Sequence, residues 1–172
     1  SKTYSNLIAD RNNMTIQDMA VSGKTLATPA DDSSVNAFSF NDYQNIDNDV
    51  DYITIMLGIN DGHKNIDIHP DLTTGIIPLG NKNDDNIHTF YGAWNVVLPY
   101  LLTNYPNARI GIIVSNGLDH TDYRTATIEM AKAYGIPYID LNGDERTPAM
   151  HRAKNENLTE VTKQILMNII LT

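Results

Sequence analysis

The sequence predicts an α/β protein in which helices cover both faces of a mostly parallel sheet, giving three layers. Short β-branched apolar segments alternate with longer segments of helical periodicity from residue 14 onward. The 172 residues, of which 41% are hydrophobic and 19% charged, are also enough to form one globular domain with its own core. We therefore expect a single domain over residues 1–172.

The expected elements follow one another along the chain. Strands are predicted at residues 14–21, 50–57, 109–114 and 136–141, and helices at 34–43, 88–105, 121–134 and 157–171. Thr121 or Asp122 is a candidate cap for the third of these helices, and Gly135 follows its expected end. Residues 3–9 resemble the last turns of a further helix. A flavodoxin-like strand order of 2-1-3-4-5 would then lack its central strand, so we expect either a different topology or a strand before Ser1.

Composition and charge exclude several classes of function. The net charge of −9 would repel phosphates, which argues against nucleic acid and anionic membrane surfaces as partners. No apolar run approaches the ~20 residues that a transmembrane helix needs. The absence of cysteine excludes disulfides, thiolate metal sites and cysteine nucleophiles, and it fits a virion or extracellular surface among other compartments.

The most informative segment is residues 53–62, where a β-branched apolar run ends in Gly58 and is followed by Asn60 and Asp61. Polar side chains released at the carboxyl end of a buried strand commonly line a ligand crevice. Asn60 is a neutral amide donor of the kind that stabilises negative charge on a substrate oxygen. We expect Asp61 to fix the adjoining loop by accepting backbone N–H groups.

These features resemble the SGNH, or GDSL-type, hydrolases, and in particular the SGNH domains of phage tail and baseplate proteins. The resemblance rests on Ala20-Val-Ser-Gly-Lys-Thr-Leu26, with Gly23 on the family glycine, and on Leu57-Gly-Ile-Asn-Asp61, with Asn60 on the family asparagine. It implies a flavodoxin-like SGNH fold and a serine esterase whose oxyanion hole contains Gly23 and Asn60. Ser22 and Asp61 would support this site. The family chemistry requires no metal and no cofactor.

Two family blocks are not found at their expected places. The Gly-Asp-Ser block should precede the helix that begins near Lys2, and no Asp-x-x-His block stands close to the final helix. We therefore expect a fragment truncated at both ends, with an unknown nucleophile and no activity of its own. Asp144 and His151 lie seven residues apart and are an alternative pair, although a solvated loop histidine is the favoured interpretation.

The long polar segment at residues 62–86 contains His63, Asp67, His69 and Asp71. These residue types can bind metals, but their spacing matches no metal motif known to us. We expect a loop at the rim of the site, in which His63 and His69 shape substrate access.

The leading prediction is an ester hydrolase, specifically a carbohydrate O-deacetylase. It would act on O-acetylated bacterial surface glycans as part of a phage or prophage structural protein, alongside other phage structural proteins. The alternative is a catalytically inactive SGNH-fold module used for carbohydrate binding, adhesion or tail structure. A flavodoxin-like nucleotide binder is weaker, because no glycine-rich loop joins a strand to a helix. The acyl group, the glycan and the oligomeric state stay open.

Overall fold

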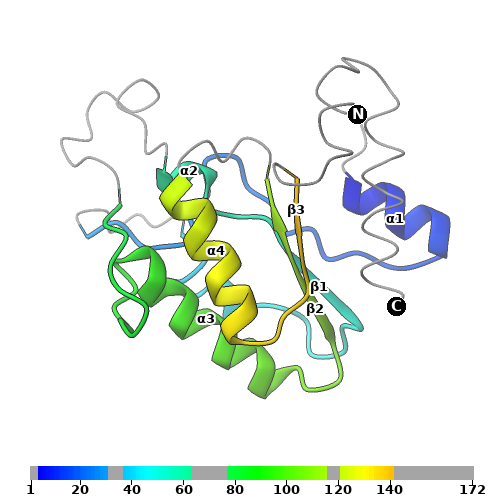
Figure 1. Cartoon of the computed structure of the whole chain (residues 1–172). Helices are drawn as coiled ribbons and strands as arrows, with labels where there is room; N and C mark the ends of the chain where they lie inside the picture. Colours follow the sequence, from blue (N-terminus) through cyan, green and yellow to red (C-terminus); the bar gives the residue numbers. More distant parts are fainter. Residues whose placement is uncertain (1–3, 31–36, 63–76, 116–120, 142–172) are drawn as a thin grey trace, which may run out of the picture.

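In the part of the chain that the structure describes, a three-stranded parallel sheet forms the centre (Figure 1). The structure is a computed structural model that describes residues 4–30, 37–62, 77–115 and 121–141. The strands are β1 (Tyr52–Ile55), β2 (Arg109–Val114) and β3 (Tyr138–Asp140), and they lie side by side in that order. Ile53 pairs with Ile110, and Ile112 pairs with Tyr138. The predicted parallel sheet is confirmed, as are three of the four predicted strands.

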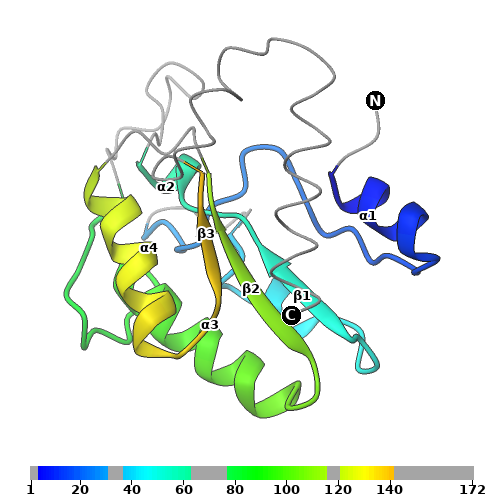
Figure 2. The same cartoon turned by 45° about the vertical axis from the view of Figure 1, so that its right-hand side comes forward.

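Helices cover both faces of this sheet, which gives the predicted three layers (Figure 2). Helices α3 (Phe90–Asn104) and α4 (Thr121–Ala133) lie on one face, and α1 (Tyr4–Asn12) lies on the other. Alternate residues of β2 point to opposite faces, as in any strand. Ile112 therefore packs in the larger core with Trp94 of α3, while Ile113 packs with Ile8 of α1.

The ends of the helices follow from their local sequence. Thr89 has an extended backbone, and its hydroxyl oxygen accepts a hydrogen bond from the backbone N–H of Gly92 at 3.2 Å, which caps α3. Gly135 has a φ of +65° just after α4, where it ends the helix as predicted. The helices predicted at residues 88–105 and 121–134 are thus confirmed to within two residues. The helical turns expected at residues 3–9 belong to α1.

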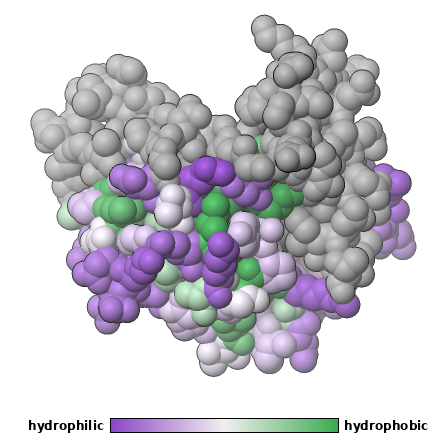
Figure 3. All heavy atoms as spheres, viewed as in Figure 1, coloured by the Kyte–Doolittle hydropathy of each residue, from purple (hydrophilic) through white to green (hydrophobic). Residues whose placement is uncertain are grey.

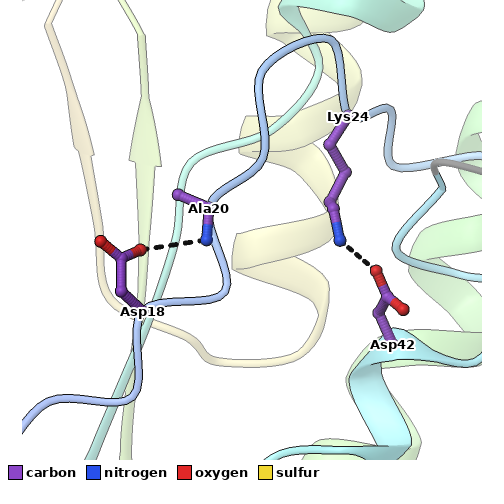
Figure 4. A network of polar contacts seen from close by, with 4 residues as sticks. All are labelled: Asp18, Ala20, Lys24 and Asp42. Carbon is purple, nitrogen blue, oxygen red and sulfur yellow. Dashed lines mark hydrogen bonds and ion pairs between the residues drawn. The ribbon is translucent and has the colours of Figure 1, made fainter.

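The strand predicted at residues 14–21 is wrong. This segment has no regular secondary structure and is mostly exposed. The side chain of Gln17 donates to the carbonyl oxygen of Asn45 and accepts from the backbone N–H of Asp47, both at 2.9 Å. Asp18 accepts from the backbone N–H of Ala20 at 3.0 Å, which forms a local turn (Figure 4). A strand would need backbone hydrogen bonds to a neighbouring strand. This segment is held instead by side-chain hydrogen bonds and a local turn.

The helix predicted at residues 34–43 is also wrong over its described part. Only a short 3₁₀ turn, η1 (Asp42–Gln44), forms there. The backbone N–H groups of Phe38 and Ser39 instead donate to the carbonyl oxygens of Thr25 and Leu26, each at 2.9 Å. This sheet-like pairing between distant segments overrides the local helical preference. The helix predicted at residues 157–171 lies outside the described residues.

Most of the described surface in Figure 3 is hydrophilic, with small separate apolar patches. Among the described residues, the large apolar side chains exposed by at least two fifths are few and come from separate parts of the chain: Ile16, Val21, Phe40, Met56 and Leu102. None of the helices that the structure describes has the length and apolar character needed to cross a bilayer.

Candidate functional site

The candidate site lies at the carboxyl end of β1. The strand ends at Ile55, and Gly58 then adopts a φ of +111°, a conformation that L side chains rarely take. This turn leads into the one-turn helix α2 (Ile59–Gly62), closed by a hydrogen bond from the N–H of Gly62 to the carbonyl oxygen of Gly58 at 3.1 Å. Asn60 and Asp61 are thereby held on a short, defined support at the edge where parallel sheets bind ligands.

Asn60 contacts the glycine block from the earlier part of the chain. Its side-chain Nδ2 donates to the carbonyl oxygen of Lys24 at 2.8 Å. Gly23, the preceding residue, has a φ of +78°, and the N–H of Lys24 donates to the carbonyl oxygen of Val21 at 3.2 Å to close the turn. The fold therefore brings the two sequence blocks that carry Gly23 and Asn60 into direct contact.

Asp61 binds the same segment further along, in a loop that we define as residues 24–28. Its carboxylate oxygens accept the backbone N–H groups of Leu26 at 2.9 Å and of Ala27 at 2.8 Å. Asp61 is wholly buried, and this burial raises its pKa to about 6 despite the hydrogen bonds, which act in the opposite direction. These are the backbone contacts expected of Asp61.

The loop is also held from its other side. The ammonium group of Lys24, a residue only 8% exposed, forms an ion pair with Asp42 (Figure 4). The hydroxyl groups of Thr28 and Ser39 lie 3.1 Å apart and share a hydrogen bond. Loop 24–28 is therefore fixed by η1 and its neighbours on one side and by α2 on the other.

Of the other predicted site residues, Ser22 is described by the structure and the histidines are not. Ser22 is exposed and lies in the same turn as Gly23. His63 and His69, predicted to shape substrate access, lie outside the described residues. The same is true of the metal-capable residues Asp67 and Asp71 and of the alternative catalytic pair Asp144 and His151. All of these positions fall at residues 63–76 or 142–172, which the structure does not describe. Within the described ranges, no group of three or more metal-binding side chains occurs.

A histidine that the sequence analysis did not select also contacts this loop. His88 Nδ1 lies 2.8 Å from the carbonyl oxygen of Thr28. Because a carbonyl oxygen can only accept, Nδ1 carries a proton in this geometry. Asp85 stands three residues before His88, so the Asp-x-x-His spacing does occur in this chain, and the prediction that it is absent is wrong. That spacing was the sequence signal that could have identified His88.

Comparison with known proteins identifies the family. A family model described as GDSL-like Lipase/Acylhydrolase matches residues 2–169, which is nearly the whole chain. The chain belongs to the GDSL-like lipase/acylhydrolase family. The resemblance inferred from the Gly23 and Asn60 blocks is thus confirmed at the level of the family. The family makes the chain a hydrolase domain and implies an ester substrate.

Solved structures show the same fold. A protein from Lactobacillus plantarum is 25% identical, with a TM-score of 0.73, over 96% of this chain and 85% of that one. A protein from Bacteroides ovatus assigned as a GDSL-like lipase is 22% identical, with a TM-score of 0.66, over 83% of this chain and 66% of that one. A protein from Bacteroides uniformis, also assigned as a GDSL-like lipase, is 22% identical, with a TM-score of 0.61, over 81% of this chain and 63% of that one. The chain thus spans about two thirds of the two Bacteroides proteins. No curated protein matches it.

Proposed function

We propose that this GDSL-like hydrolase domain cleaves esters through an oxyanion hole formed by the backbone N–H of Gly23 and the side-chain amide of Asn60. The observation that carries the proposal is the hydrogen bond from Asn60 Nδ2 to the carbonyl oxygen of Lys24. A carboxamide has two N–H bonds, so holding one of them on Lys24 orients the amide and leaves the second as the donor to substrate.

The chemistry that these two donors would assist is acyl transfer. A serine hydroxyl attacks the ester carbonyl, a histidine accepts the serine proton, and the carbonyl oxygen becomes an oxyanion that Gly23 and Asn60 bind. The tetrahedral intermediate then expels the alcohol, which takes a proton from the histidine, and water cleaves the acyl-enzyme by the same steps. The nucleophile is not assigned to any described residue. Ser22 and Asp61 act as supports, with Ser22 in the turn and Asp61 on the loop.

The proposed substrate is an O-acetylated glycan on a bacterial surface, and the proposed setting is a phage or prophage structural protein, on a virion or extracellular surface. These finer assignments are supported by the resemblance of the Gly23 and Asn60 blocks to phage SGNH domains. The net charge of −9 is consistent with an uncharged ester and unfavourable for polyanionic partners. His63 and His69 would shape access to the site.

The oxyanion role is tested by Asn60→Ala in the natural protein that contains this domain, with p-nitrophenyl acetate as substrate. We expect kcat to fall by about 10²–10³ with little change in KM, because the lost donor acts mainly in the transition state. Asn95→Ala is the matched control. Asn95 Nδ2 also donates to backbone carbonyl oxygens, those of Lys82 at 2.8 Å and Asp84 at 2.6 Å, but in a different loop.

Three outcomes are informative. A selective loss in Asn60→Ala supports the oxyanion hole. Equal turnover in Asn60→Ala and the wild type removes Asn60 from the mechanism. A wild-type protein that binds O-acetylated glycan but releases no acetate from it points instead to the inactive carbohydrate-binding module.

A further inference from the structure

Asn60 and Asp61 are consecutive residues of α2, and both bind loop 24–28. Asn60 donates to the carbonyl oxygen of Lys24, while Asp61 accepts from the N–H groups of Leu26 and Ala27. Three hydrogen bonds from one dipeptide therefore hold three residues of the loop, Lys24, Leu26 and Ala27. The turn that contains Gly23 is joined directly to that loop through Lys24. The distance between the Gly23 turn and the Asn60 amide consequently depends on the position of loop 24–28 relative to α2.

The group that holds loop 24–28 against α2 is the buried carboxylate of Asp61, which is an unusual choice for a contact with a structural role alone. Leu26 and Ala27 are fully buried, so their N–H groups need acceptors inside the protein. A buried carboxylate is a costly acceptor, because no bond to a cation compensates its charge among the described residues: the ammonium group of Lys24 binds Asp42 instead. Tyr123 of α4 is a titratable side chain that interacts with Asp61: burial, and then the charge of Asp61, raise the pKa of Tyr123 to about 12, so its phenol is neutral and supplies no compensating charge.

We propose that Asp61 is a positioning residue, whose ionised carboxylate sets the place of the Gly23 turn relative to the Asn60 amide. The proposal rests on the oxyanion hole proposed above. An ionised carboxylate has two oxygens that accept equally well, one for each backbone N–H. A carboxamide offers one such oxygen and turns its NH₂ group toward the other N–H, and in the protonated acid the hydroxyl oxygen is a weaker acceptor than a carboxylate oxygen. One of the two loop contacts is then lost or weakened, and the loop moves relative to α2.

The first test is kinetic. In the natural protein, Asp61→Asn should lower kcat for p-nitrophenyl acetate by about 10–100-fold with KM nearly unchanged, because a misplaced donor weakens the transition state more than the ground state. Asp84→Asn is the matched control. Asp84 accepts the backbone N–H of Asn86 at 2.9 Å and the hydroxyl of Thr89 at 2.7 Å, and so braces a different loop. Its kcat should stay within about twofold of the wild type.

The second test needs no activity and no variant. In a ¹⁵N-labelled sample of the 172-residue chain, the amide resonances of Leu26, Ala27 and Gly23 and the side-chain amide of Asn60 are followed from pH 4.5 to 7.5. All four should shift together with an inflection near pH 6, where Asp61 changes charge. The Asn86 amide, bonded to Asp84, should show no inflection in this range.

The outcomes separate this proposal from the one on which it rests. If Leu26 and Ala27 shift while Gly23 and Asn60 do not, Asp61 holds the loop without positioning the site, and the inference is overturned. An unchanged kcat in Asp61→Asn overturns it too. If Asn60→Ala lowers kcat in the same assay, the oxyanion hole survives that failure; if Asn60→Ala has no effect, the oxyanion hole itself has failed.

Discussion

Two loops of this protein are held by the same kind of contact, yet the two carboxylates involved behave in opposite ways. Asp61 accepts two backbone N–H groups of loop 24–28, and Asp84 accepts one backbone N–H and one hydroxyl in residues 80–89. Burial raises the pKa of Asp61 to about 6. The hydroxyl of Thr89 and the N–H of Asn86 lower the pKa of Asp84, which remains hydrated.

Both carboxylates accept hydrogen bonds, so the difference in burial accounts for the opposite directions of their pKa shifts. The ionised form of Asp84 is favoured in the folded state, so it contributes to stability at neutral pH. The ionised form of Asp61 is disfavoured by burial, so it reduces stability at neutral pH. Residues that break a local stability rule tend to lie at functional sites, which agrees with the position of Asp61 beside Asn60.

The largest expected effect concerns how closely the loop at residues 80–89 packs on α3. A Cβ at Gly92 would lie far inside van der Waals contact with the backbone carbonyl of Asn86. Gly92→Ala should therefore lower the free energy of unfolding by about 2–4 kcal/mol, measured by urea denaturation. Gly135→Ala is the control, because its φ is +65° but its surroundings are open, and it should cost about 1 kcal/mol. Equal losses would show that the contact between this loop and α3 can relax.

The second effect is the pH dependence of stability that Asp61 causes. Its pKa is higher in the folded state than the ordinary 3.8, so the folded state holds this proton more tightly than the unfolded chain does. The resulting stability is present below pH 3.8 and is lost as the pH rises through about 6. Relative to Asp61→Asn, the wild type should lose about 2 kcal/mol of unfolding free energy between pH 4 and pH 7. Parallel stability curves for the two proteins would contradict the burial of this charge.

The smallest effect is expected at Asp84, and it has the opposite sign. A lowered pKa means that its contribution is present above the ordinary value of 3.8 and is lost as the pH falls. Compared with Asp84→Asn, the wild type should be slightly more stable at pH 7, and this advantage should vanish on acidification. The measurement is a series of thermal melts at several pH values. If the contributions of Asp84 and Asp61 to stability changed in the same direction with pH, the contrast between the two loops would be wrong.

Much of the fold could be predicted from the sequence because local periodicity and caps decide it. The apolar run at residues 109–114 became β2, and Gly135 ended α4 as its backbone freedom suggested. The segment at residues 14–21 has a strand-like composition, but a strand also requires a partner, which composition does not reveal. The same holds for residues 37–39, which pair with loop 24–28 instead of forming a helix.

The candidate site was predictable only in part. The family resemblance implied that Gly23 and Asn60 belong to one site, and the structure brings the two blocks into contact through Lys24. The acceptor itself, a backbone carbonyl, has no sequence signature. The ion pair between Lys24 and Asp42 joins residues 18 positions apart, so no spacing rule suggested it. The burial that shifts the pKa of Asp61 depends on packing from several elements, and a single sequence does not contain that information.

The dipeptide of Asn60 and Asp61 in α2 has a consequence for the timing of catalysis in the proposed mechanism. Its three hydrogen bonds form when the domain folds, so the dipoles that meet the substrate oxygen need no rearrangement during the reaction. The entropy lost in ordering the loop is then incurred once per molecule, and not at every turnover. Rate differences among esters should accordingly arise from how their acyl and alcohol groups fit the rest of the crevice.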